Sequence, residues 1–267
     1  MAEGSAKPPV PLVPRALPRG DTVTAWSILI LLAVLAWLVT IQQTRGMGLG
    51  TGTMGVALPT FLAFWITMMA AMMLPSVAPV AVAWARAIGK QSSGLRRTAR
   101  TTQFLAGYLL AWGTFGGLAY GGLVALERAL RMHPEVGRWV GTAVFAAAGL
   151  QQLGPLKDVC LRHCRSPLMQ LFEYAQFHGW ARDLRVGAHH GSYCVGCCWG
   201  LMILLVPLGV MNIAAMAGLA MLIFAEKLSR WGPVIARVAG VGFLILAALT
   251  PFQFWPLPGL EPTMRMD

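Results

Sequence analysis

Long apolar runs separated by short polar segments dominate this sequence and constrain its fold. An α-helix needs about 20 predominantly apolar residues to cross a bilayer, and a helix satisfies its own backbone polar groups within lipid. Charged residues make up only 12% of the 267 residues, whereas a soluble domain normally has about a quarter. We therefore predict an all-α fold, a polytopic transmembrane helix bundle with six or seven spans. The candidate spans are 23–41, 57–84, 102–126, 138–154, 193–210, 213–229 and 233–252.

The choice between six and seven spans depends on the runs 193–210 and 213–229. Both runs are short, and only Met211 and Asn212 separate them. They form either two tilted helices with a tight turn or one longer, broken element. In the second case the C-terminus changes sides of the membrane, so its location stays open.

The basic residues predict an orientation. With seven alternating spans and a cytoplasmic N-terminus, sixteen of the 21 Lys and Arg residues fall in cytoplasmic segments. Cytoplasmic loops of membrane proteins carry such an excess. The formal net charge of +11 then lies in loops beside anionic headgroups, so we expect the lipid bilayer as a partner and no nucleic acid. The outside residues are Arg45, Arg128, Arg131, Arg138 and Arg265.

One membrane domain with a tail at each end is the expected organisation. Residues 1–20 are rich in proline and predict a disordered cytoplasmic tail. Residues 21–253 should form the helix bundle, with a Cys- and His-containing loop at about 155–192, and residues 254–267 a short polar tail. No clean small-residue cleavage site follows the first apolar run, so we expect this run to remain as an anchor.

Three cysteines at the start of an apolar run indicate the functional site. Cys194, Cys197 and Cys198 lie within five residues of one another. The spacing of the first two is suited to a metal chelate, and also to a redox dithiol at a helix N-terminus. His189 and His190 lie just upstream and add imidazole donors as weaker candidates.

The remaining two cysteines lie about thirty residues earlier. Cys160, His163 and Cys164 share one face if this segment is helical, because positions i, i+3 and i+4 do so. We interpret all five cysteines and His163 as candidate metal ligands. An odd number of cysteines in a reducing cytoplasm fits a metal site better than a structural disulfide framework.

The metal expected at these ligands is Cu(I) rather than Zn(II). Tetrahedral sulfur-rich sites hold Zn(II), whereas soft thiolate and thioether ligands select Cu(I). A methionine-rich stretch in the second apolar run favours copper, although methionine also fills gaps in any helix bundle. Pro75 and Pro79 are expected to kink this helix, and Glu226 is expected to mark the membrane surface. The methionines are Met68, Met69, Met72 and Met73.

Three segments resemble a family of bacterial predicted metal-binding integral membrane proteins, catalogued as a domain of unknown function. They are WITMMAAMMLP at 65–75, QLGPLKDVCLRHCRSP at 152–167, and GSYCVGCCWGLMILLVPLGVMN at 191–212, followed by Glu226-Lys227-Leu228. The resemblance implies a multi-pass protein of the bacterial inner membrane. It implies a metal site at the five cysteines, with the methionine stretch at 68–73 as a further candidate.

Metal handling without catalysis is therefore the leading hypothesis. The protein would bind a soft ion and exchange it with a metal donor or acceptor protein. A second hypothesis is a membrane thiol–disulfide oxidoreductase, which needs exchangeable disulfides. A third is a structural or assembly subunit of a membrane complex, in which the cysteines are packing residues.

Overall fold

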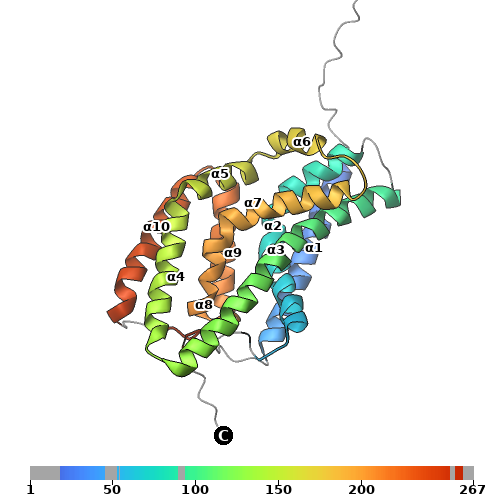
Figure 1. Ribbon diagram of the computed structural model, residues 1–267. Helices are drawn as coiled ribbons and strands as arrows, with labels where there is room; N and C mark the ends of the chain where they lie inside the picture. The colour runs from blue at the N-terminus through green and yellow to red at the C-terminus, as the bar shows by residue number, and fades with distance from the viewer. Residues whose placement is uncertain (1–18, 46–52, 54, 90–93, 253–255, 261–267) are drawn as a thin grey trace, which may run out of the picture.

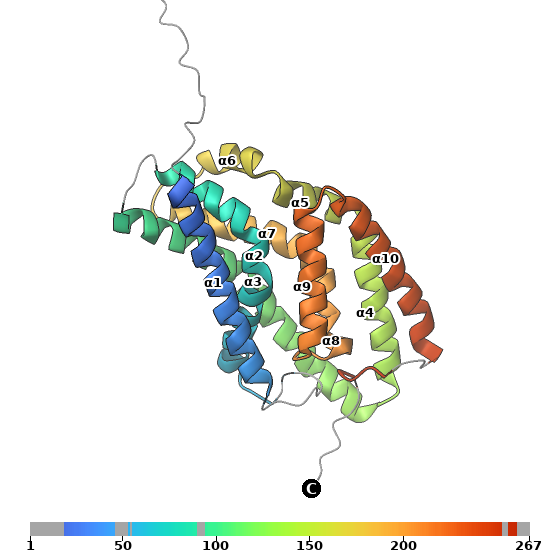
Figure 2. The same ribbon diagram turned by 180° about the vertical axis from the view of Figure 1, so that it is seen from behind.

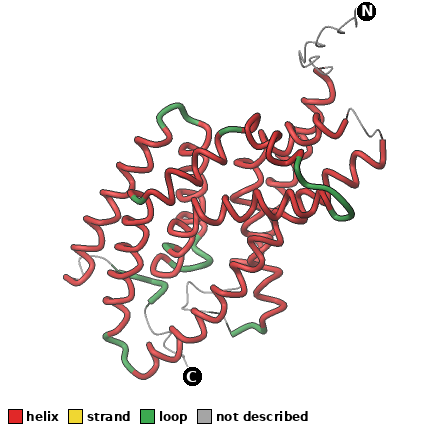
Figure 3. The backbone as a smooth tube through the Cα atoms, turned by 45° about the horizontal axis from the view of Figure 1, so that its top comes forward, coloured by secondary structure: helices red, strands yellow, loops and turns green. Residues whose placement is uncertain are grey.

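The protein is a bundle of helices with short connections. The computed structural model describes residues 19–45, 53, 55–89, 94–252 and 256–260 (Figure 1). These residues contain no strand (Figure 3), which confirms the predicted all-α fold. The helices are α1 (Arg19–Thr44), α2 (Leu58–Gly89), α3 (Gly94–Met132), α4 (Val136–Leu153), α5 (Pro155–Arg165), α6 (Pro167–Ala175), α7 (Arg182–Ile203), α8 (Leu205–Leu208), α9 (Ile213–Leu228), α10 (Gly232–Leu249) and η1 (Thr250–Phe252).

Five helical segments are long and apolar enough to cross a membrane. The predicted runs 138–154 and 213–229 also fold as helices, but neither belongs to this set. Helix α4 has 18 residues, with Arg138, Gln151 and Gln152 among them, and α9 has only 16 residues. The five segments are Trp26–Thr44, Leu58–Gly89, Gly94–Met132, Arg182–Leu208 and Gly232–Phe252.

The uncertain runs 193–210 and 213–229 belong to separate helices. Gly209 has a φ of 93°, a left-handed value that favours glycine, and it ends α8. The side chain of Asn212 then accepts a hydrogen bond from the Ala215 N–H at 3.1 Å and caps α9. The tight turn predicted as one of two alternatives is therefore present.

The connecting segment at 155–192 is largely helical and contains α5, α6 and the start of α7. Pro155 and Pro167 open α5 and α6, where a missing N–H costs nothing, and α7 begins at Arg182. Figures 1 and 2 show α5 and α6 at one end of the bundle and α8 toward the other. The polar start of α7 is stabilised at this end, because the Arg100 Nε donates to Asp183 Oδ2 at 2.8 Å.

Helices α3 and α7 pack closely because glycines face each other's backbone. A Cβ on Gly107 would lie 2.9 Å from the Ala188 nitrogen and would clash with the Leu184 carbonyl oxygen. A Cβ on Gly187 would clash with the Phe104 carbonyl oxygen in the same way. Small residues permit such close approach of membrane helices, and this contact holds the beginning of α7 in place.

Replacing Gly107 by Ala should therefore destabilise the protein. Overpacking typically costs about 1–3 kcal/mol, and here the neighbouring atoms belong to rigid backbone. Gly117→Ala on the same helix is the matched control, because a Cβ there has nothing within 4 Å. Thermal unfolding in detergent micelles should show a lower Tm for Gly107→Ala alone, and equal Tm values for the two variants would contradict this role of the glycine.

Candidate metal centre

Three cysteine sulfurs on α7 lie together in the interior. Cys194, Cys197 and Cys198 each place Sγ within 4.8 Å of the other two, and the sulfurs of Cys197 and Cys198 are 3.2 Å apart. With a metal–sulfur bond of about 2.3 Å, two ligands of one ion can be at most about 4.6 Å apart. Small side-chain adjustments would therefore let all three sulfurs bind one ion. We call these three residues the thiol cluster.

Helix α5 brings a fourth sulfur to the thiol cluster. The Sγ atoms of Cys164 and Cys197 are 3.9 Å apart, so thiols from two distant parts of the sequence do meet. Cys160 faces Gly196 instead, where a Cβ would lie 2.9 Å from its sulfur. Burial raises the pKa of Cys160, and the nearby Lys157 opposes this shift. All five cysteines are buried and free.

A buried lysine contacts the thiol cluster directly. The Lys227 ammonium donates to the Cys194 sulfur at 2.9 Å and to Ser76 Oγ at 3.3 Å. The Tyr108 hydroxyl lies 3.1 Å from the same sulfur. A positive charge at this distance stabilises a thiolate. The Cys194 sulfur is therefore prepared to bind a cation.

Glu226 is buried inside the bundle rather than exposed to solvent. The side chain is 1% exposed and accepts a hydrogen bond from Lys157 Nζ at 2.6 Å. Gln152 Nε2 donates to its other oxygen at 2.6 Å. A charged group loses its hydration when buried, and these two partners on α4 and α5 replace the water.

Lys157 connects this buried pair to the thiol cluster. Its ammonium also donates to the Cys197 carbonyl oxygen at 2.8 Å, and Gln151 Nε2 donates to the same oxygen at 3.1 Å. Burial alone would lower the pKa of Lys157, but the neighbouring thiols and the Glu226 carboxylate outweigh it and raise the pKa. The lysine therefore stays charged and holds α5 against α7.

The three candidate histidines are divided between two environments. His190 is buried, and its Nδ1 lies 2.9 Å from the Tyr174 hydroxyl, as expected of a core histidine. His163 and His189 lie nearer the surface, with Glu173 between them. Burial lowers the pKa of His163, and Glu173 opposes this shift. The structure thus brings His163 to a carboxylate rather than to the sulfurs of Cys160 and Cys164.

The methionine stretch belongs to α2 and lies in the hydrophobic core of the protein. This helix continues through Pro75 and Pro79. Ser76 donates to the Met73 carbonyl oxygen at 2.9 Å, so the stretch ends one turn before the residue that contacts Lys227. The helix therefore approaches the thiol cluster through Ser76. The four buried methionines are Met68, Met69, Met72 and Met73.

Several polar residues around the site were not identified from the sequence as site residues. One signal could have revealed some of these residues, because ionisable groups inside membrane segments usually have a function and a partner. Glu226-Lys227 at the end of an apolar run gave this signal, whereas Glu173 and Tyr108 gave none. The residues missed are Tyr108, Gln151, Gln152, Lys157, Glu173 and Lys227.

A family model described as "PpoB2: Copper chaperone" matches residues 62–250, which is more than half of the chain. The match includes the thiol cluster and all residues described around it. Comparisons with curated proteins and with solved structures found no match. The chain belongs to the PpoB2 copper chaperone family.

Proposed function

We propose that this protein is a membrane-embedded chaperone that binds Cu(I) at the thiol cluster and exchanges it with a partner protein. The observation that carries the proposal is the grouping of three buried sulfurs within 4.8 Å. Thiolates are soft ligands that select Cu(I). Cys164 lies 3.9 Å from Cys197 and provides a fourth sulfur to which the ion can move during exchange.

The thiol cluster and Lys227 can hold Cu(I) without a net charge. Cu(I) bound by two thiolates carries one net negative charge, and the Lys227 ammonium lies 2.9 Å from Cys194. Together these groups are neutral, and burying a neutral assembly avoids most of the cost of burying an isolated charge. Three thiolates would give the same neutrality with Zn(II), so the preference for Cu(I) rests on the softness of the sulfur ligands.

Exposed apolar side chains support a location in the membrane. Helix α1 exposes Ile28, Leu31 and Leu38, and α10 exposes Val238 and Ile245. Large exposed apolar surfaces mark contact with a membrane or another protein. With the excess of basic residues in the cytoplasmic segments, we propose that the end with α5 and α6 faces the cytoplasm of a bacterium.

Metal analysis of the purified full-length protein tests this function. Wild-type protein in detergent should bind Cu(I) in competition with a coloured Cu(I) chelator. The variant with Cys194, Cys197 and Cys198 all changed to Ser should lose this binding. Cys160→Ser is the matched control, because Cys160 lies outside the thiol cluster, and it should keep its Cu(I). Equal copper binding in all three proteins would refute the assignment of the site.

The same three proteins also distinguish copper binding from the two alternative functions, thiol–disulfide exchange and a structural role. Thiol trapping should find the cysteines reduced in the resting protein and protected from alkylation after Cu(I) loading. Reversible pairing of Cys164 with Cys197, without retention of copper, would instead support a thiol–disulfide oxidoreductase. Normal assembly of a membrane complex by the triple Ser variant would support the role of a structural subunit.

A further inference from the structure

A second group of metal-ligating side chains lies outside the thiol cluster. His163, Glu173 and His189 place one ligand atom each within 4.8 Å of one another. Glu173 Oε2 is 3.6 Å from His163 Nδ1, and Glu173 Oε1 is 3.3 Å from His189 Nε2. Three different helices, α5, α6 and α7, supply the three residues. The fold rather than local sequence spacing therefore brings them together.

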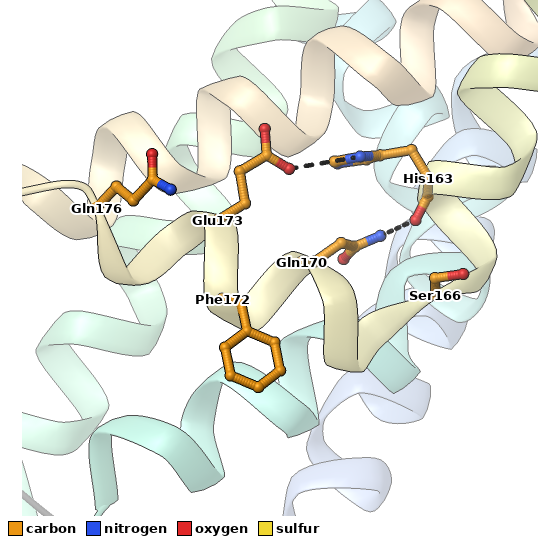
Figure 4. Close-up of a pocket in the computed structure, with 6 residues that line it drawn as sticks. All are labelled: His163, Ser166, Gln170, Phe172, Glu173 and Gln176. Atoms are coloured by element: carbon orange, nitrogen blue, oxygen red, sulfur yellow. Dashed lines mark hydrogen bonds and ion pairs between the residues drawn. The ribbon is translucent and has the colours of Figure 1, made fainter.

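The two imidazole rings are held in position by aromatic neighbours. The ring of Tyr193 stacks on His163 with centroids 3.8 Å apart and planes at 14°. His189 packs against Phe177 with centroids 5.3 Å apart. Gln170 Nε2 also donates to the His163 carbonyl oxygen (Figure 4), which fixes α6 relative to α5. Rings held by packing in this way form a preorganised set of ligands.

Solvent can reach this group through a pocket. The pocket has a volume of about 360 Å³ and is lined by His163, Ser166, Gln170, Phe172, Glu173 and Gln176 (Figure 4). The side chains of His163, His189 and Glu173 are 15%, 28% and 39% exposed. Partial exposure leaves room for water at a fourth coordination position, as in zinc sites with three protein ligands.

The donor atoms differ in kind from those of the thiol cluster. Two imidazoles and a carboxylate are borderline and hard ligands, which suit a divalent ion such as Zn(II) or Cu(II). The ring nitrogens that face Glu173 are His163 Nδ1 and His189 Nε2, at 3.6 Å and 3.3 Å from its two oxygens, so these two nitrogens would be the ligand atoms.

We propose that His163, Glu173 and His189 form a second metal site, which binds a divalent cation independently of the thiol cluster. The site lies at the surface of the end of the protein that carries α5 and α6. His163 is the direct neighbour of Cys164 on α5. Binding here holds α5, α6 and α7 together through one ion. The inference does not depend on copper binding by the thiol cluster.

Zn(II) binding to a full-length variant without the thiol cluster tests this proposal. In a background with Cys164, Cys194, Cys197 and Cys198 changed to Ser, equilibrium dialysis should find about one Zn(II) per chain. Adding His163→Ala, or Glu173→Gln alone, should weaken Zn(II) binding by at least about tenfold. The matched control is His133→Ala, which removes an exposed histidine that lies 3.3 Å from Glu135, and it should leave the affinity unchanged.

A second measurement covers the case in which the Ser background fails to fold. Wild-type protein loaded with Cu(I) should still take up one Zn(II), and Glu173→Gln should lose it while keeping Cu(I). Zn(II) binding that survives both His163→Ala and Glu173→Gln would overturn the proposal, as would its absence from folded protein. Loss of Cu(I) binding alone would refute the proposed function and leave this site standing.

Discussion

Glu226→Ala is expected to destabilise the protein by about 3–5 kcal/mol, because it leaves the buried Lys157 ammonium without its carboxylate. Both side chains are 1% exposed, and 2.6 Å separates Lys157 Nζ from Glu226 Oε2. Gln152 would lose its acceptor as well. Thermal unfolding in detergent should show a Tm well below that of the wild type, together with poor yield of folded protein.

Two further variants separate the missing charge from the missing side chain. Glu226→Gln retains a hydrogen-bond acceptor but not the charge. Its Tm should fall between that of the wild type and that of Glu226→Ala. The double variant Lys157→Met with Glu226→Met removes both charges, and it should recover much of the stability because apolar replacements of a buried pair are often neutral. A double variant less stable than Glu226→Ala would contradict this account.

Lys227→Met is expected to weaken Cu(I) binding about 10- to 100-fold, the usual effect of removing a group that supports a metal ligand. The ammonium lies 2.9 Å from the Cys194 sulfur and stabilises its negative charge. Methionine has a similar length and no charge, so the packing around it changes little. Competition with a Cu(I) chelator measures the affinity directly.

Ser76→Ala is the matched control for this lysine. Ser76 is the other partner of Lys227, at 3.3 Å, and its loss leaves the charge beside Cys194 unchanged. The affinity of Ser76→Ala for Cu(I) should stay within about threefold of the wild type. If Lys227→Met and Ser76→Ala weakened binding equally, the hydrogen-bond network rather than the charge would govern affinity.

The helices could be predicted from the sequence because a long apolar run can be recognised without knowledge of its tertiary contacts. Their bounds were less predictable where tertiary contacts extend a helix into polar sequence. Helix α7 begins at Arg182 rather than near residue 193, because Asp183 is paired with Arg100, which lies 83 residues away in the chain. The polar residues of α5 likewise find partners on α7 and α9, and these contacts cannot be predicted from local sequence.

The cysteine ligands of the candidate site could be predicted from the sequence, but the charged residues around them could not. Clustered cysteines are rare enough to indicate a site by themselves, and the structure groups Cys164 with the three cysteines of α7. Lys227 lies 33 residues from Cys194, and Glu173 lies 10 residues from His163 and 16 from His189. These residues lie on different helices, so only the folded chain shows them together.

The burial of the thiol cluster determines how fast an ion could be handed over. The three sulfurs are at most 1% exposed, so a docked acceptor cannot touch the ion while the helices are closed. Transfer of an ion from this cluster would therefore require the helices to open, and the frequency of that opening would set an upper limit on the rate. If Cu(I) is bound there, the same barrier would shield it from small cellular thiols, and retention between encounters would be kinetic as well as thermodynamic.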